Sequence, residues 1–175
     1  MDKLFLGLLF LTVDIRIGLG NMTVDLLPNF AGYLLLGKGF EALQGAVPRF
    51  QPIKPWTTAL AVYSGALFGL DLLGISFESD LVMWLLGLAA MAAGFYVSHV
   101  LVMGIGDLER SNAVDLGSGK LKTMWLYWVI FAIISYLIIW LPLVGTVATV
   151  ASAILAIAFL LTFYKTKNAW ETHQT

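Results

Sequence analysis

Long apolar runs separated by short polar connectors dominate the chain. Four of these runs cover residues 56–74, 81–105, 121–141 and 144–164. Each reaches the roughly 20 residues that a helix needs to cross a bilayer core of about 30 Å. Pro142 follows the third run, and proline does not continue a helix comfortably. The pattern predicts four transmembrane helices, the last two joined by a tight hairpin at Pro142.

The N-terminal part of the chain is less regular. An apolar run over residues 4–20 contains Asp14 and Arg16, and a second run covers residues 25–44. Asp25 stands shortly before Pro28, an arrangement typical of an acidic N-cap with proline in the first helical turn. Both runs are marginal in length for a membrane span. They predict two short spans, and a re-entrant hairpin is the alternative.

The basic residues orient these segments. Cytoplasmic loops of membrane proteins carry an excess of lysine and arginine. If the N-terminus is cytoplasmic, Arg16 is the one basic residue on the outer side. The inner side then holds Lys3, Lys38, Arg49, Lys54, Arg110, Lys120, Lys122, Lys165 and Lys167.

These features together predict an all-α fold, a polytopic transmembrane helical bundle of about six membrane segments. A single domain covers residues 1–175, and both termini are cytoplasmic. Residues 107–120 are expected to form a cytoplasmic loop that is long enough to contact a partner, and residues 165–175 a cytoplasmic tail.

The composition agrees with a membrane location. Of the 175 residues, 59% are hydrophobic and 12% are charged, whereas a soluble domain carries about 25% charged residues. The net charge of −1 provides no basic field for nucleic acid. The chain has no cysteine and two distant histidines, His99 and His173, so we expect no metal site. No cofactor is indicated, and the lipid bilayer is the expected partner.

Small residues recur in two of the apolar runs, 81–105 and 144–164. Small side chains allow membrane helices to approach closely. These runs are therefore expected to line the bundle interior, or to contact a second copy of the chain or another membrane protein. The residues are Gly87, Ala89, Ala90, Ala92, Ala93, Gly94 and Ser98 in the first run, and Gly145, Ala148, Ala151, Ser152, Ala156 and Ala158 in the second.

Charged residues inside apolar segments are the first candidates for function, because each costs about 2.5–3.5 kcal/mol to insert. Asp14, Arg16 and Asp25 lie in the N-terminal pair of segments, where Arg16 can pair with Asp25 across the turn. Asp71 either joins this cluster or is an ordinary interfacial carboxylate. The cluster is either an ion pair that stabilises a short hairpin or a ligand or ion site at an outward-facing cavity.

Two further residues have a weaker claim. His99 is a lone membrane histidine, which is more typical of a packing element than of a proton relay. Asp107 ends the stretch Gly104-Ile105-Gly106-Asp107, which resembles the GxGD element of intramembrane aspartyl proteases. Such an enzyme shares one proton between two carboxylates. The predicted topology instead puts Asp107 on the inner side and Asp14 toward the outer side, and no catalytic residue is assigned.

The N-terminal segments also carry a family resemblance. Asp14-Ile15-Arg16-Ile17-Gly18, followed by Asp25-Leu26-Leu27-Pro28-Asn29 and Gly32-Tyr33, resembles an element of small polytopic membrane proteins common in Gram-positive bacteria. Asn29 stands where that group usually has aspartate. The resemblance implies a multi-pass protein of the bacterial cytoplasmic membrane, but no reaction. It draws attention to Pro28, Gly32 and Tyr33 as structural residues, with Gly32 permitting close helix approach.

The sequence therefore favours a non-enzymatic membrane protein, either an accessory or scaffold component or a binder of a small ligand. A small transporter or channel that uses Asp14, Arg16 and Asp25 is the first alternative. An intramembrane aspartyl protease with Asp107 is the second.

Overall fold

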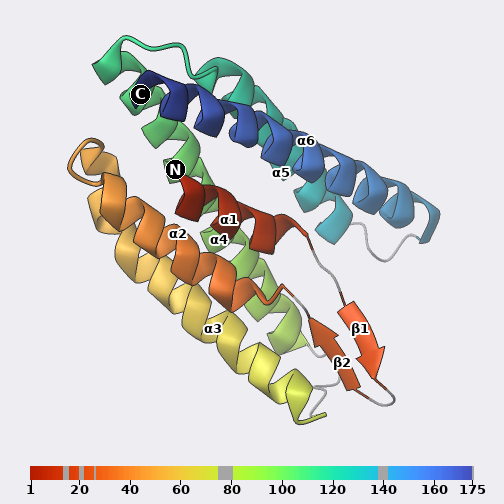
Figure 1. Cartoon of the computed structure of the whole chain (residues 1–175). Helices are drawn as coiled ribbons and strands as arrows, with labels where there is room; N and C mark the ends of the chain where they lie inside the picture. Colours follow the sequence, from red (N-terminus) through yellow and green to blue (C-terminus); the bar gives the residue numbers. More distant parts are fainter. Residues whose placement is uncertain (14–15, 20–21, 26, 75–80, 138–141, 175) are drawn as a thin grey trace. The chain divides into compact units, whose positions relative to one another are not determined.

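The structure is a computed structural model that describes residues 1–13, 16–19, 22–25, 27–74, 81–137 and 142–174 (Figure 1). The chain divides into two compact units. The N-terminal unit is formed by Asp2–Val100, and the C-terminal unit mainly by Leu101–Thr175. The helix α4 (Leu81–Asn112) contributes to both units.

The described residues are mainly helical, as the sequence predicts. Three helices are long and apolar enough to cross a membrane, namely α4, α5 (Ser118–Leu137) and α6 (Pro142–Gln174). These three helices are consistent with a membrane protein. The remaining elements are α1 (Asp2–Thr12), β1 (Arg16–Leu19), β2 (Met22–Asp25), α2 (Asn29–Leu43), the 3-10 helix η1 (Pro48–Ile53) and α3 (Lys54–Leu72).

The helix α3 occupies the predicted span 56–74 but is not among those three candidates. It carries Lys54, Ser64 and Asp71 among its apolar residues. The helices α1 and α2 have 11 and 15 residues, which correspond to lengths of about 16 and 22 Å. Neither is long enough alone for a hydrocarbon core of about 30 Å.

The N-terminal unit is built around α2, which packs against α1 and against α3. Glycines bring α1 and α2 unusually close together. A Cβ atom on Gly7 would stand 2.8 Å from the Gly32 carbonyl oxygen and 2.9 Å from the Leu36 nitrogen. On Gly39 it would stand 2.5 Å from a methyl carbon of Leu4. Early residues of α1 contact late residues of α2, and late residues of α1 contact early residues of α2. The two helices are therefore antiparallel.

A two-stranded antiparallel hairpin, β1–β2, separates α1 from α2 (Figure 1). The sequence pattern, with helices expected over 4–20 and 25–44, did not predict it. Strand-favouring Ile17 and Val24 are opposite each other in the register. Asp25 ends β2 and is not the cap of α2; Pro28 occupies the N-cap position, without a side-chain hydrogen bond. The predicted capping role of Asp25 is therefore wrong, because the strand continues through that residue.

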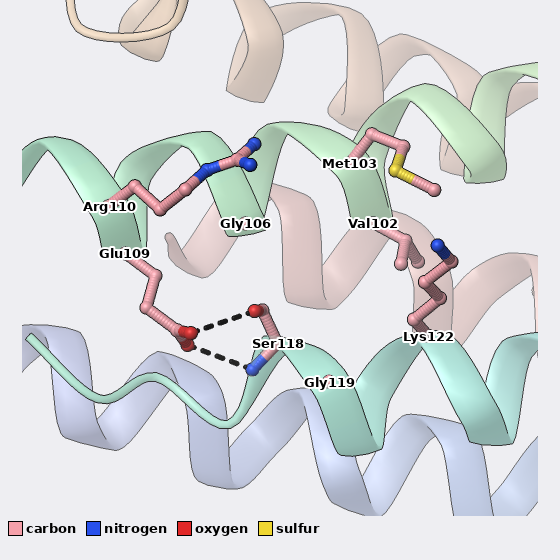
Figure 2. A pocket seen from close by; sticks show the side chains of 8 residues that line it. All are labelled: Val102, Met103, Gly106, Glu109, Arg110, Ser118, Gly119 and Lys122. Carbon is pink, nitrogen blue, oxygen red and sulfur yellow. Dashed lines mark hydrogen bonds between the residues drawn. The ribbon is translucent and has the colours of Figure 1, made fainter.

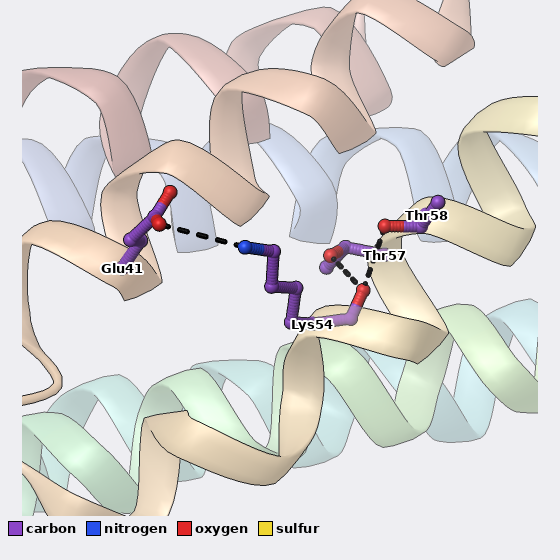
Figure 3. Close-up of polar contacts among 4 residues, drawn as sticks. All are labelled: Glu41, Lys54, Thr57 and Thr58. Carbon is purple, nitrogen blue, oxygen red and sulfur yellow. Dashed lines mark hydrogen bonds and ion pairs between the residues drawn. The ribbon is translucent and has the colours of Figure 1, made fainter.

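An exposed ion pair joins α2 to the start of α3 (Figure 3). The Lys54 ammonium lies 3.5 Å from a Glu41 carboxylate oxygen. The hydroxyls of Thr57 and Thr58 donate to the Lys54 carbonyl oxygen at 3.0 and 2.9 Å (Figure 3). Basic residues of three elements also come at this end of the unit, because Lys38 lies near the end of α2, Arg49 in η1 and Lys54 at the start of α3.

In the C-terminal unit, α5 and α6 pack side by side (Figure 1). The rings of Trp128 and Phe159 stack with centroids 5.4 Å apart, and the Ser135 and Thr149 hydroxyls share a hydrogen bond of 2.7 Å. The opposite face of α6 is exposed and apolar over its whole first part. Stripes of this extent are rare on soluble proteins and suit acyl chains. The exposed side chains include Leu143, Val144, Val147, Val150, Ile154, Ile157 and Leu161.

Helical structure in this unit extends further than the sequence predicts, at the end of α4, the start of α5 and the end of α6. The expected loop 107–120 is reduced to residues 113–117, because α4 continues to Asn112 and α5 begins at Ser118. The expected tail is the last part of α6, where Trp170 is buried. The helix α6 begins at Pro142, where proline is well tolerated, and the hairpin expected before it, 138–141, lies outside the described residues.

Candidate functional site

The junction between α4 and α5 is held by one carboxylate. One Glu109 oxygen accepts hydrogen bonds from the backbone N–H groups of Leu116 and Ser118, both at 2.9 Å. The other accepts from the Ser118 hydroxyl at 2.9 Å (Figure 2). Glu109 therefore caps the first turn of α5, which otherwise leaves unsatisfied N–H groups.

Two residues with positive φ let the chain reverse over this short distance. Ala113 has φ 52° and Gly117 has φ 69°. Glycine adopts this conformation without the steric penalty of a Cβ atom. The third helix is tied to the same connector, because the buried Thr166 hydroxyl of α6 donates to the Leu116 carbonyl oxygen at 2.8 Å. The junction is thus a fixed framework of three helix ends.

A cavity of about 220 Å³ lies at this junction (Figure 2). From α4 it is lined by Val102, Met103, Gly106, Glu109 and Arg110. From α5 it is lined by Ser118, Gly119 and Lys122. Its lining thus includes apolar side chains, Val102 and Met103, and two cationic side chains, Arg110 and Lys122.

The charges around the cavity are unequally compensated. The Arg110 guanidinium donates to an Asp107 carboxylate oxygen one helical turn away at 2.6 Å, and its side chain remains 76% exposed. Glu109 directs both oxygens to the start of α5. Lys122 forms no hydrogen bond or ion pair with any residue in the described part of the chain. Two acidic and two basic groups thus balance in number here, and Lys122 is the cationic lining residue without a direct carboxylate partner among the described residues.

Glu109, Lys122 and Thr166 were not singled out by the sequence. Glu109 stands nine residues before Ser118, so their meeting depends on the chain reversal at Gly117. The one available signal was a glutamate placed before a Gly-Ser-Gly turn that opens a helix. In the sequence that glutamate is indistinguishable from an ordinary solvated loop residue.

The predicted N-terminal cluster is described only in part. Asp14 lies outside the described residues. The hairpin register sets Arg16 directly opposite Asp25, which brings their backbones together as the pairing hypothesis requires. Asp71 is exposed in the last turn of α3, and its carbonyl oxygen accepts from the Gly74 N–H at 3.1 Å.

The three residues expected to be structural lie at helix contacts or ends. Pro28 precedes α2 with extended backbone, φ −63° and ψ 132°. Gly32 is buried, and a Cβ atom there would stand 2.9 Å from Leu11 on α1. The Tyr33 hydroxyl lies 3.1 Å from the place of a Cβ on Gly94. Tyr33 therefore packs against α4 where that helix has a glycine.

His99 and Asp107 belong to different units of the chain. His99 is half-buried on α4. Asp107 is also helical and not in a loop as expected, and its side chain is 29% exposed. Within the described ranges no group of three or more His, Cys, Asp or Glu side chains is arranged to hold a metal ion.

Comparison of the chain with protein-family models, with curated proteins and with solved structures finds no match. Functional inference therefore depends on the geometry of the α4–α5 junction.

Proposed function

We propose that the protein is a non-enzymatic, multi-pass component of a bacterial cytoplasmic membrane that binds a small ligand in the α4–α5 cavity. The cavity is the observation that carries this proposal. It combines apolar lining residues with a few polar groups, which is the usual composition of a ligand site. Its framework is held by the hydrogen bonds of Glu109.

The environment of the nearby carboxylates supports a non-enzymatic role. An aspartyl dyad requires two carboxylates that share one proton. Asp107 accepts from the Arg110 guanidinium at 2.6 Å and is therefore paired with a cation and not with a second carboxylate in that contact. Glu109 is likewise occupied as a helix cap. The two acidic residues of this junction are thus explained by structural contacts.

The proposed topology has six membrane segments with both termini cytoplasmic. Because α1 and α2 are antiparallel, they enter and return on the same side even if neither crosses the bilayer completely. Crossings by α3, α4, α5 and α6 then return the chain to that side. The C-terminal unit has its basic residues beside the ends of its apolar stretches, on the side that the proposal makes cytoplasmic. They are Arg110, Lys120, Lys122, Lys165 and Lys167.

The proposed bacterial origin depends on the N-terminal element that includes Asp25, Pro28, Gly32 and Tyr33. Membership of the small bacterial membrane proteins that share this element remains part of the proposal. The proposed partner of the chain is either another membrane protein or a second copy of the chain itself.

A cavity-filling substitution tests the ligand-binding role. A Cβ on Gly119 meets nothing within 4 Å, so Gly119→Leu fills the cavity without a backbone clash. The purified full chain is heated in detergent with inorganic phosphate, glycerol 3-phosphate or phosphatidylglycerol, and with glycerol or phosphatidylcholine as neutral controls. We expect at least one anion to raise the melting temperature of the wild type and not of Gly119→Leu.

Gly45→Leu is the matched control, because a Cβ on Gly45 also meets nothing within 4 Å but lies far along the chain from the cavity. It should respond to the anion as the wild type does. A wild type that none of the anions stabilises would refute ligand binding at this site, as would an unchanged response in Gly119→Leu.

The hairpin register favours a second candidate function, a small transporter that uses Asp14, Arg16 and Asp25. The backbones of Arg16 and Asp25 are register partners in β1 and β2. In a cellular uptake assay, Arg16→Gln and Asp25→Asn would be made singly and together. Recovery of folding without uptake in the double variant would support transport, and recovery of both would identify a structural ion pair.

A further inference from the structure

A stripe of exposed apolar side chains runs along α5 and begins at the cavity residue Lys122. Lys122 is followed on the same helical face by Leu126, Ile130, Ile133 and Leu137, with spacings of three or four residues. These four apolar side chains are between 37% and 52% exposed. At about 1.5 Å per residue, the stripe extends some 22 Å from the lysine.

One amphiphile matches both parts of this face. A cationic side chain at the cavity wall suits an anionic headgroup, and an exposed apolar stripe of this length suits an acyl chain. We infer that the α4–α5 cavity binds the phosphate headgroup of an anionic phospholipid while an acyl chain lies along the α5 stripe. This inference deepens the proposed ligand-binding function and rests on it.

The polar half of the site has donors in surplus. Lys122 extends from α5 toward α4 beside Val102, and Arg110 lies along α4 near Gly106 (Figure 2). Arg110 uses one N–H group of its guanidinium on Asp107, and its side chain is 76% exposed, so its other N–H groups are left to donate to a ligand. The N-terminus of α5 contributes little, because Glu109 already accepts from its first N–H groups. The two cationic side chains are therefore the recognition elements.

The size and position of the cavity also fit a headgroup. A volume of about 220 Å³ is below the roughly 300–1,000 Å³ of pockets for drug-sized ligands. It accommodates a phosphate group and a few attached atoms. Val102 and Met103 form its apolar side, where the headgroup continues into the hydrocarbon part of a lipid. A soluble phosphate would leave the apolar side and the α5 stripe unused.

The test compares two lipids with identical acyl chains, phosphatidylglycerol and phosphatidylcholine, with glycerol 3-phosphate as a headgroup that lacks acyl chains. Binding to the delipidated full chain is measured from the melting temperature as a function of lipid concentration. We expect phosphatidylglycerol to bind the wild type more tightly than phosphatidylcholine. Lys122→Gln should weaken phosphatidylglycerol binding about fivefold, the effect of one basic residue near a membrane surface, and leave phosphatidylcholine binding unchanged.

Lys120→Gln is the matched control, because it removes the same charge two residues away from a residue that does not line the cavity. It should retain the preference for phosphatidylglycerol. Lys122 forms no hydrogen bond or ion pair with the described residues, so its variant should melt like the wild type without lipid. Equal weakening in both lysine variants would overturn the inference, since general surface charge would then explain the preference.

The remaining outcomes separate the inference from the function on which it rests. If glycerol 3-phosphate binds as tightly as phosphatidylglycerol, the ligand is a soluble phosphate; the lipid assignment fails and ligand binding stands. If none of the three compounds protects the wild type and Gly119→Leu changes nothing, both fail.

Discussion

Gly7→Ala is the substitution whose effect the structure specifies best. The added Cβ would stand 2.8 Å from the Gly32 carbonyl oxygen and 2.9 Å from the Leu36 nitrogen. Both are backbone atoms, so no side-chain rotation relieves the clash. Because comfortable contacts begin near 3.5 Å, α1 and α2 would have to separate by roughly 0.6 Å or more along their interface.

Two opposing terms give the expected magnitude. Alanine is favoured over glycine in a helix interior by about 1 kcal/mol. Overpacking of a close interface costs about 1–3 kcal/mol. Gly65→Ala supplies the propensity term alone, because its Cβ would meet Phe30 of α2 at an ordinary 3.6 Å. We therefore expect Gly7→Ala to be less stable than Gly65→Ala by about 1–3 kcal/mol.

The assay is reversible unfolding of both variants by denaturing detergent in mixed micelles, with helical circular dichroism as the signal. Gly65→Ala should be as stable as the wild type or slightly more stable. A Gly7→Ala protein with the same unfolding free energy as Gly65→Ala would refute the close approach of α1 and α2.

Three further substitutions test the α4–α5 junction. Glu109→Gln should lower the free energy of unfolding by about 1–3 kcal/mol, because an amide cannot accept all three hydrogen bonds; a wild-type value would contradict the capping role. Thr166→Val should cost about 1–3 kcal/mol by leaving a buried carbonyl unpaired, whereas Thr123→Val, which removes an exposed hydroxyl bonded to Gly119, should cost less; equal losses would contradict this. Gly117→Ala should cost about 1–2 kcal/mol at φ 69°, measured in the same way, and no loss would show that this conformation is not required.

The helices of the second half of the chain could be predicted because apolar run length is a strong signal. Their ends could not. The structure continues α4 to Asn112 and α6 to Gln174, into stretches where polar residues interrupt the apolar pattern. Buried Leu108 and Trp170 show that these extensions are stabilised by packing, which single-segment hydropathy does not report.

The N-terminal hairpin was missed for a different reason. Residues 16–19 and 22–25 are apolar enough to extend a helical run, and hydropathy does not distinguish a short strand from the end of a helix. The register does set the backbones of Arg16 and Asp25 opposite each other, and the sequence had suggested that this pair could meet across the turn between two helices. The ion pair between their side chains stays a prediction.

The candidate site itself was beyond the sequence. The role of Glu109 exists only because Gly117 and Ala113 reverse the chain and return Ser118 to it. The sequence placed Lys122 in the predicted inner set, which stays a prediction, and its place at a cavity wall depends on how α4 and α5 pack. Tertiary placement, and not residue type, separates these side chains from ordinary interfacial charges.

The most direct test of the account is the side of the membrane on which the α4–α5 junction lies. The chain has no cysteine, so single cysteines report without background. Lys120→Cys and Leu143→Cys, at the starts of α5 and α6, are treated in intact cells with a membrane-impermeant maleimide. The account predicts labelling of Leu143→Cys alone, with Lys120→Cys labelled only after the membrane is opened. Labelling of Lys120→Cys in intact cells would contradict it.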